Sequence, residues 1–365
     1  MSEPVRFGVI GIKGMGRGHI RAIGEVEGAE LAAICDIDAD AARTTAQELE
    51  VPWYEDYREM YRQGGMDAVS IATPHYLHAP MAIDAMRTGI HAFTEKPIAI
   101  SAREADEMIA VAAETGMKLG VCHNRRASGL SQALKQIVDQ GRLGRITRVL
   151  WTSCGLRTQA YYDSGEWRGT WEQEGGGVLI NQTVHDMDLL QWLVGPVVEV
   201  AAIIGRLSHR TQVEDIAGAA VRFGNGAYGV LQFGLINVPG MSRAEIAGDL
   251  ATIVLGNEGP RLGALPASVL GYIQGKPELP DKLEPTWEPV AALEVEQGHR
   301  AMIHDFCLAI TEDREPMVTG ESARPAVELV NAIIMSSVRG KKVSIPVDRD
   351  EYDAVLRELA ARKDL

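Results

Sequence analysis

The 365-residue sequence has little cysteine and no long apolar run. Its four cysteines, at positions 35, 122, 154 and 307, have no C-x-x-C spacing, which favours free thiols in a reducing compartment. No apolar run approaches the roughly 20 residues needed to span a bilayer. A strand pattern begins almost at the first residue and leaves no room for a signal peptide. We therefore expect a soluble, cytoplasmic protein with no membrane partner.

Positive charge is also scarce, because 36 Lys and Arg face 50 Asp and Glu, giving a formal net charge of −14. No basic stripe interrupts this excess, which excludes a nucleic-acid partner since phosphate binding needs clustered cations. Apolar residues make up 46% and charged residues 24% of the chain, an ordinary globular composition. The length favours two domains over one.

Residues 1–123 alternate short apolar runs with helical stretches, which predicts an α/β Rossmann domain with a parallel sheet. The expected strands lie at 5–10, 31–35, 68–72, 91–93 and 119–122. Their apolar runs are continuous, as in strands buried on both faces. Helices are expected between them, with N-caps at Asp38 and Ser101.

After residue 123 the pattern predicts an α+β domain, 124–365, with a large, mostly antiparallel open sheet. Strands are expected at 146–153 and over 197–255, with a hairpin at 224–226 and helices at 130–138, 178–193, 299–310, 321–338 and from 349. The proline-rich segment 257–295 is expected to be a loop, and the terminal helices are free to pack on the first domain. An open sheet face would expose an apolar patch, which predicts a homodimer or homotetramer.

A glycine-rich turn between the first strand and helix indicates a dinucleotide site, because backbone amides there can approach a pyrophosphate. Gly11 and Gly16 fit the first and third fingerprint positions, but Lys13 occupies the second. The lysine either adds a cation beside the pyrophosphate or displaces the phosphates outward. The expected cofactor contacts here are Gly11, Ile12, Lys13, Gly14, Met15 and Gly16.

Asp36 lies twenty residues beyond Gly16 at the end of the second predicted strand, followed by Ile37. A carboxylate there accepts hydrogen bonds from the adenosine ribose and repels a 2′-phosphate. The sequence therefore predicts NAD in preference to NADP, with Asp36 and Ile37 at the adenosine. The alternative is that Asp36 only caps the next helix.

Several motifs, in order along the chain, carry a resemblance. They are Ala72-Thr73-Pro74-His75, Glu95-Lys96-Pro97, Cys122-His123-Asn124-Arg125-Arg126 and the glycine-rich stretch 175–190. Together they resemble the Gfo/Idh/MocA family of glucose–fructose oxidoreductases, inositol dehydrogenases and rhizopine-catabolism proteins, over essentially the whole chain. The resemblance implies that nicotinamide lies where the strand ends of the first domain face the second domain's sheet. It implies cofactor contacts from Thr73, Pro74, His75, His78, Glu95, Lys96 and Asn124.

Oxidation of a secondary alcohol needs a base and a group that stabilises the developing alkoxide. Lys96 suits stabilisation, the alternative being a surface lysine in a turn. His185 suits general acid/base catalysis, because its intrinsic pKa lies near working pH. Asn181, His185 and Asp188 are spaced i, i+4 and i+7, so they are expected on one face of a helix. The alternative is a histidine satisfied in the core.

Many relatives have aspartate where this chain has Asn181. An amide holds a hydroxyl but cannot take a proton, so proton transfer is expected to fall on His185, assisted by Lys96. The ring-rich loop 161–171 is expected to stack on a sugar, with Trp167 and Arg168 in the pocket and Tyr162 favoured over Tyr161. The alternative is that these rings pack the loop against the sheet. The expected substrate contacts are Lys96, Arg125, Tyr162, Trp167, Arg168, Asn181 and His185.

These observations predict an NAD-dependent dehydrogenase acting on a hydroxyl of a sugar, glycoside or cyclitol. A redox-neutral enzyme that retains NAD and oxidises a sugar transiently is the alternative, and a non-catalytic sensor is a third. The histidines at 75, 78, 123 and 185 are dispersed along the sequence, so no metal is expected. A Ser-His-Asp hydrolase is excluded because the nucleophile elbow is missing.

Overall fold

The computed structural model describes residues 3–275 and 282–362. The chain forms two compact units. The first comprises Met1–Ala127, Gln173–Gly175 and Val295–Val327, and the second comprises Ser128–Glu172, Gly176–Glu294 and Glu328–Leu365. The chain thus returns to the first unit after the second is largely complete. The functional division at residues 123 and 124 stays a prediction.

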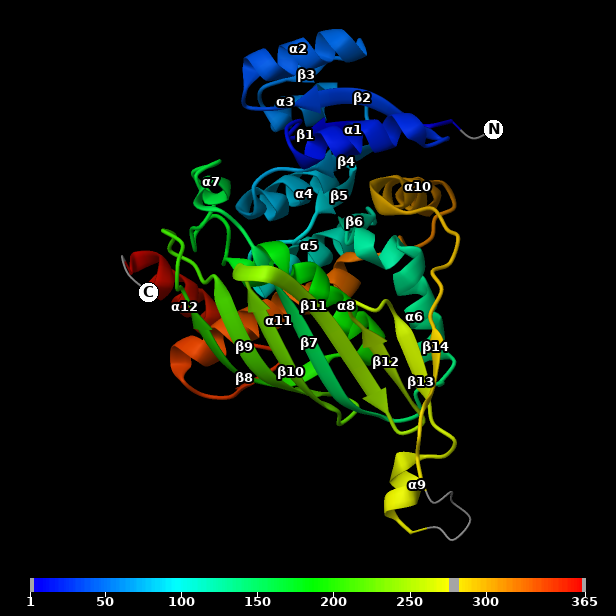
Figure 1. The fold of residues 1–365 in the computed structure, drawn as a ribbon. Helices are drawn as coiled ribbons and strands as arrows, with labels where there is room; N and C mark the ends of the chain where they lie inside the picture. The colour runs from blue at the N-terminus through cyan, green and yellow to red at the C-terminus, as the bar shows by residue number, and fades with distance from the viewer. Residues whose placement is uncertain (1–2, 276–281, 363–365) are drawn as a thin grey trace. The chain divides into compact units, whose positions relative to one another are not determined.

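The first unit contains a parallel sheet with strand order β3-β2-β1-β4-β5-β6, which confirms the Rossmann prediction (Figure 1). The strands are β1 Val5–Ile10, β2 Ala29–Cys35, β3 Trp53–Tyr54, β4 Ala68–Ile71, β5 His91–Glu95 and β6 Leu119–Cys122. The sequence did not reveal β3, because two residues are too short to show a periodicity. The carboxyl ends of β1, β2, β4 and β5 all lie at one edge, where ligands of such sheets bind.

Two helices of the first unit begin where the caps predicted them. Asp38 accepts a hydrogen bond from Ala41 N at the start of α2, and Ser101 accepts one from Glu104 N at the start of α5. The helices are α1 Met15–Glu25, α2 Ala39–Leu49, α3 Tyr57–Gln63, α4 His78–Arg87, α5 Ala102–Thr115 and α10 Gly298–Thr311, with short turns η1 His75–Leu77 and η2 Asn124–Ala127.

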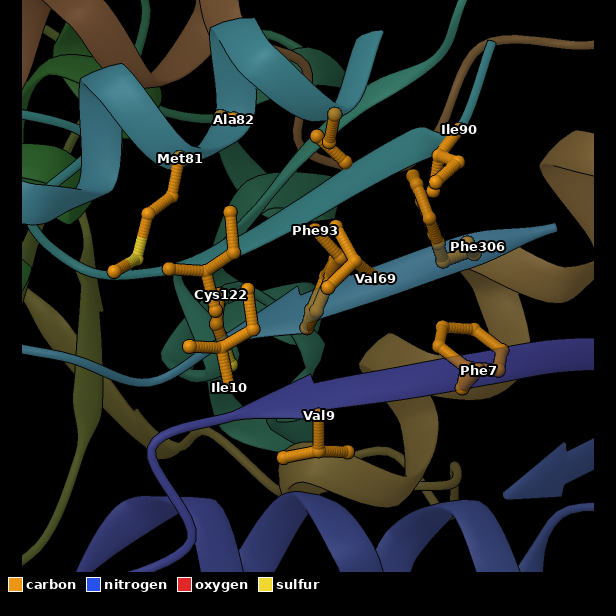
Figure 2. Packing of buried hydrophobic residues seen from close by; sticks show 14 of the residues in the cluster. Phe7, Val9, Ile10, Val69, Met81, Ala82, Ile90, Phe93, Cys122 and Phe306 are labelled. Carbon is orange, nitrogen blue, oxygen red and sulfur yellow. The ribbon is translucent and has the colours of Figure 1, made fainter. Parts of the chain in front are cut away.

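Helix α10, from late in the chain, contributes to the core of the first unit (Figure 2). The Phe306 ring lies 5.2 Å from that of Phe93 on β5 and 6.4 Å from that of Phe7 on β1, measured between centroids. All three rings are fully or almost fully buried. Truncating such a ring costs about 3–5 kcal/mol, so α10 is a structural part of this unit.

The second unit contains a nine-stranded sheet with order β14-β13-β12-β11-β7-β10-β9-β8-β15. Of the pairs found in the described chain, β7 and β10 are parallel and the others antiparallel, which confirms the mostly antiparallel prediction. The strands are β7 Ile146–Leu156, β8 Val197–Gly205, β9 Ile216–Phe223, β10 Tyr228–Gly234, β11 Ile236–Gly248, β12 Ala251–Leu255, β13 Arg261–Ala264, β14 Thr286–Pro289 and β15 Val343–Ser344.

Two expectations for the second unit were wrong. The segment 257–295 contains β13, β14 and the short helix α9 Val269–Ile273, besides residues 276–281, which lie outside the described residues. The helix expected over 178–193 is divided into a π-helical turn, η3 Val178–Gln182, and α8 Val184–Val194. The remaining helices are α6 Gly129–Asp139, α7 Gln159–Tyr162, α11 Gly320–Arg339 and α12 Arg349–Ala361. Within the described ranges, none of the helices combines the length and apolarity needed to cross a bilayer.

Candidate cofactor and substrate sites

The turn between β1 and α1 has the close backbone approach that a dinucleotide cradle requires. A Cβ on Gly16 would lie 1.7 Å from the carbonyl oxygen of Gly11. One on Gly11, whose φ is +80°, would lie 2.7 Å from the carbonyl oxygen of Ala72. Gly14, at the N-cap of α1, offers no side chain to its first amides, and the first turn has no acidic residue. These features suit an anion at the helix N-terminus.

Asp36 holds this turn from the end of β2. Its Oδ2 accepts a hydrogen bond from Ile12 N at 3.0 Å, and its Oδ1 accepts one from Asp38 N at 2.9 Å. Asp38, and not Asp36, supplies the side-chain cap of α2. The alternative capping role for Asp36 is therefore wrong. Next to it, the Ile37 side chain is 89% exposed, an apolar surface available to an adenine.

Lys13, at the second fingerprint position, turns its ammonium to Asp38. The Nζ–Oδ2 distance is 2.6 Å, and both side chains are exposed. This hydrogen bond raises the pKa of Lys13 and lowers that of Asp38. The lysine thus contacts the N-cap residue of α2. This contact corresponds neither to a cation beside the pyrophosphate nor to a side chain that displaces the phosphates.

Glu95, at the end of β5, is the centre of a buried hydrogen-bond network. His19 Nε2 on α1 lies 2.8 Å and His299 Nε2 on α10 lies 3.0 Å from Glu95 Oε1. Lys96 N donates to Glu95 Oε2 at 3.1 Å, and Ser70 Oγ lies 2.7 Å from His19 Nδ1. The carboxylate therefore fixes the backbone of the candidate catalytic lysine, which is half-buried and precedes a cis proline.

The charge state of this network follows from its contacts. Burial alone raises the pKa of Glu95, but hydrogen bonds from His19 and His299 outweigh it and hold that pKa well below its ordinary value. Burial and the neighbouring Glu95 carboxylate raise the pKa of the Cys122 thiol well above its usual range. The centre is an ionised carboxylate surrounded by donors.

The same four side chains have metal-ligand chemistry, which the sequence did not suggest. Donor atoms of His19, Glu95, Cys122 and His299 all lie within 4.8 Å of one another. Ligand atoms around a tetrahedral zinc, at about 2.0 Å from the metal, are separated by about 3.3 Å. The 2.8 and 3.0 Å nitrogen–oxygen distances are instead those of hydrogen bonds. The geometry therefore favours hydrogen bonds over metal ligation. The expectation of no metal stays a prediction.

Of the histidines expected along the cofactor channel, His78 is fully buried. Its Nδ1 lies 2.7 Å from the carbonyl oxygen of Pro97 and its Nε2 lies 2.9 Å from that of Thr73. His78 therefore joins the loops after β4 and β5, and its contact with the cofactor stays a prediction. His75 is also buried, with Nδ1 2.9 Å from the carbonyl oxygen of Glu174, whereas Thr73 and Pro74 are half-buried.

The motif after β6 divides its residues between core and surface. His123 is fully buried, Asn124 is half-buried and Arg125 is exposed. Arg126 is buried and donates to the carbonyl oxygen of Ser322 at 2.7 Å, which ties this motif to α11. Asn124 and Arg125 thus retain accessible surface, as their predicted contacts require.

In the second unit, the candidate substrate residues lie on two successive elements. Asn181 is buried within η3, whereas His185 is half-buried in the first turn of α8, beyond Thr183. The expected single helical face is therefore interrupted. Glu214, which the sequence analysis missed, fixes this turn because its Oε1 accepts hydrogen bonds from Gly177 N at 2.9 Å and Leu179 N at 3.1 Å. Such π-helical turns are frequent at functional sites.

The ring-rich loop is organised by Tyr161, which had been ranked below Tyr162. The Tyr161 hydroxyl accepts from Arg168 Nη1 at 2.7 Å and from Asn181 Nδ2 at 3.0 Å. The Arg168 guanidinium lies 4.4 Å from the Trp167 ring centroid. Tyr162, by contrast, is 4% exposed and packs into the unit. The substrate contact expected of Tyr162 stays a prediction, and Tyr161 is the residue whose hydroxyl joins Arg168 to Asn181.

The parallel sheet, glycine turn and acidic residue at the end of β2 define the class of NAD-binding Rossmann oxidoreductases. Residues 5–123 match the oxidoreductase family with an NAD-binding Rossmann fold, and residues 131–254 match the Gfo/Idh/MocA C-terminal domain. The chain belongs to the Gfo/Idh/MocA family, as its motifs suggested.

Individual relatives extend this similarity. The structure of the WlbA dehydrogenase from Bordetella pertussis, in complex with NADH and UDP-GlcNAcA, is 30% identical with a TM-score of 0.81, covering 95% of this chain and 100% of that one. A scyllo-inositol 2-dehydrogenase (NAD(+)) from Bacillus subtilis is 28% identical, over 70% of this chain and 75% of its own. A 2,7-anhydro-N-acetylneuraminate hydratase from Mediterraneibacter gnavus is 27% identical, over 64% and 62%.

Proposed function

We propose that the protein is an NAD-dependent oxidoreductase that transfers a hydride between nicotinamide and a secondary hydroxyl or ketone of a sugar, glycoside or cyclitol. The observation that carries the cofactor preference is the Asp36 carboxylate, held at the end of β2 by Ile12 N and Asp38 N. It leaves lone pairs for ribose hydroxyls and repels a 2′-phosphate. The turn from Gly11 to Gly16 would hold the pyrophosphate, and NAD, when bound, supplies the hydride acceptor.

The substrate class is supported by relatives named as dehydrogenases of inositol and of a nucleotide sugar. In this chain Lys96 stabilises the alkoxide that develops when a hydroxyl loses its proton. Its backbone is held by Glu95, so the side chain starts from a fixed point. His185 takes the proton, because the amide of Asn181 can position a hydroxyl but cannot accept one.

The test is NADH formation with a panel of pyranoses, glycosides and inositols. Lys96→Ala should lower kcat/KM by about 100-fold or more for any substrate found. The matched control is Lys342→Ala, which removes an exposed lysine paired with Glu199 at 3.2 Å and should leave the rate unchanged. His185→Asn should remove the limb of the kcat–pH profile that reports the base.

Two other outcomes separate the alternatives. NAD retained by the purified protein, with product formed and no NADH, would identify the redox-neutral chemistry for which the hydratase-named relative is a precedent. Neither bound nor bindable NAD would refute the proposed function.

A further inference from the structure

The second unit contains a pocket of about 500 Å³ whose lining is cationic. Arg168, Arg206 and Arg210 all line it, together with His209, and no acidic side chain is among its described lining residues. A volume of this size falls within the range of sites that take small ligands, roughly 300–1,000 Å³. The concentration of positive charge contrasts with the net charge of −14 of the whole chain.

The three guanidinium groups have no ionic partner in the part of the chain that the structure describes. Arg168 donates to the Tyr161 hydroxyl at 2.7 Å, and Arg206 donates to the carbonyl oxygen of Thr211. Neither these two nor Arg210 forms an ion pair with a described carboxylate. Each guanidinium carries five N–H donors, so most of their donors remain available to a ligand.

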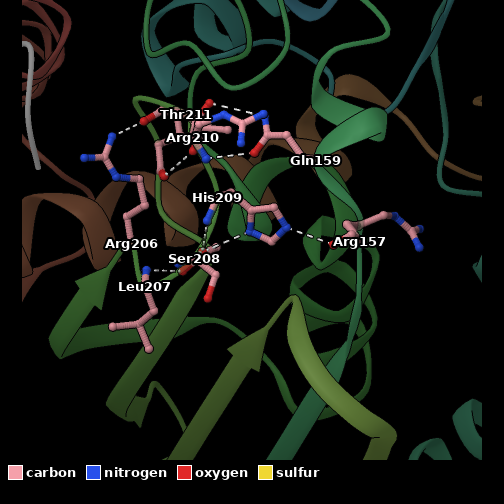
Figure 3. Close-up of polar contacts among 10 residues, drawn as sticks. Arg157, Gln159, Arg206, Leu207, Ser208, His209, Arg210 and Thr211 are labelled. Carbon is pink, nitrogen blue, oxygen red and sulfur yellow. Dashed lines mark hydrogen bonds and ion pairs between the residues drawn. The ribbon is translucent and has the colours of Figure 1, made fainter.

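The loop carrying two of these arginines is held rigidly from behind (Figure 3). Buried Asp215 accepts hydrogen bonds from the backbone N–H groups of Leu207, Ser208 and His209 at 2.8, 2.9 and 3.1 Å. His209 Nδ1 contacts Asp215 Oδ2 at 2.9 Å, and its Nε2 contacts the carbonyl oxygen of Arg157 at 2.8 Å. The imidazole therefore bridges the Asp215 carboxylate and the backbone of Arg157.

The Asp215 carboxylate is occupied by hydrogen bonds from its own loop, and the arginines carry the positive charge of the pocket. Burial raises the pKa of Asp215, but hydrogen bonds from Leu207, Ser208 and His209 outweigh it and lower that pKa. Both carboxylate oxygens already accept hydrogen bonds from the loop. It is thus not available to neutralise Arg206 or Arg210.

Three further hydrogen bonds fix the walls of the pocket in the absence of a ligand. The Gln159 side chain accepts from Arg210 N at 2.8 Å and donates to the Arg210 carbonyl oxygen at 3.3 Å (Figure 3). Gln212 N donates to the carbonyl oxygen of Gly169 at 2.7 Å, joining the two loops of the pocket. A preformed site of this kind binds without a large ordering cost.

The pocket connects with the candidate substrate residues of the same unit. Arg168 and Asn181 donate to one oxygen, the hydroxyl of Tyr161, at 2.7 and 3.0 Å. We propose that the pocket binds an oxyanion, a phosphate or carboxylate group, carried by the substrate whose hydroxyl is oxidised. That the oxyanion belongs to the substrate rests on the proposed function, whereas binding of an anion to the pocket can be tested without it. The substrate class becomes phosphorylated or acidic sugars.

The direct test is calorimetric titration of the whole protein with inorganic pyrophosphate and with D-glucuronate. NAD is kept present, because the glycine turn of the first unit is itself expected to take a pyrophosphate. At least one probe should bind with a Kd below about 1 mM, weakening with salt. The probe that binds more tightly distinguishes phosphate from carboxylate.

Arg210→Gln should weaken this binding about 10-fold, as expected for one lost hydrogen bond between charged groups. Arg210 is exposed, so this variant should fold even where Arg206→Gln, which also loses the contact to Thr211, does not. Arg357→Gln, at an exposed arginine of α12, changes the charge equally outside the pocket and should bind as wild type. Equal binding by Arg210→Gln and wild type, or binding of neither probe, would overturn the proposal.

Kinetics separate this inference from the proposed function. Once a substrate is known, Arg210→Gln should lower kcat/KM for the phosphorylated or acidic sugar about 10-fold without changing its kcat. The kcat/KM for the corresponding neutral sugar should stay unchanged. Arg210-dependent binding without NADH formation from any sugar would refute the proposed function and leave the anion site standing. NADH formation in which Arg210→Gln leaves the preference for anionic over neutral substrates unchanged would refute the anion site and leave the proposed function standing.

Discussion

Replacing Glu95 by glutamine tests whether the buried network around it stabilises the first unit. The change preserves the volume of the side chain but removes the charge that accepts hydrogen bonds from His19 and His299. Each hydrogen bond to a charged group contributes about 1.5–3 kcal/mol, and removing one partner of a buried pair costs about 3–5 kcal/mol. We expect a loss of about 3 kcal/mol, or a Tm lower by roughly 6–12 °C for a domain of this size.

The pH dependence gives this prediction a sign. Because the folded-state pKa of Glu95 lies well below its ordinary value of 4.5, its contribution is fully present above about pH 4.5 and is lost as pH falls through the folded pKa. The stability difference between wild type and Glu95→Gln should therefore be constant near neutral pH and shrink in acid. Urea unfolding between pH 3.5 and 7, monitored by tryptophan fluorescence, measures this difference.

A matched control variant and a double-mutant cycle complete the experiment. Glu59→Gln, at an exposed position where Gln63 Nε2 donates at 3.0 Å, should change stability by less than about 0.5 kcal/mol. Combining Glu95→Gln with His299→Asn should give a coupling energy of about 1 kcal/mol or more. A Tm within about 2 °C of wild type, or a difference that does not change in acid, would refute the network as described. Stoichiometric zinc in the purified protein would assign the same side chains to a metal instead.

Three further outcomes are expected. Asp36→Ser should raise the KM for NAD by about 10-fold or more and improve the use of NADP, because it removes the carboxylate that we propose contacts the ribose and repels a 2′-phosphate; an unchanged ratio of initial rates with NAD and with NADP would contradict this. Asp215→Asn should lower the Tm by several degrees in calorimetry, since four hydrogen bonds to a buried carboxylate are weakened. Val230→Asp, at a residue 54% exposed on β10, should dissociate the predicted homo-oligomer in light scattering, and a wild-type monomer would contradict the prediction.

The sheet of the first unit could be predicted because its signals are local. Continuous apolar runs gave β1 without error over Val5–Ile10, and the caps Asp38 and Ser101 marked two helix starts. Each signal is contained within a few residues of the element it specifies. The π-helical turn over Val178–Gln182 has the same apolar pattern as an α-helix, so no signal in the sequence marks the division between η3 and α8.

The candidate sites could be predicted only where a motif carried them. Asp36 lies at a fixed spacing from the glycine turn, so its position was predictable. His299 contacts Glu95 across 204 residues, and Glu214 contacts Gly177 across 37. Such pairs are set by how the elements pack, which spacing does not encode. The difference in burial between Tyr161 and Tyr162 could not be predicted for the same reason, since neighbouring residues of a loop differ in burial only once the loop is packed.

These long-range contacts also explain why the chain returns to its first unit after residue 295. The six strands of that unit are complete by Cys122, yet neither its core nor its polar centre is. Phe306 on α10 covers the rings of Phe7 and Phe93, and His299 on the same helix supplies the second donor to Glu95. Helix α10 therefore both completes the apolar core and holds the Glu95 carboxylate next to Lys96. A change that loosens α10 should therefore both weaken the fold and misplace the candidate catalytic lysine, so we expect stability and the proposed activity to fall together when this helix is disturbed.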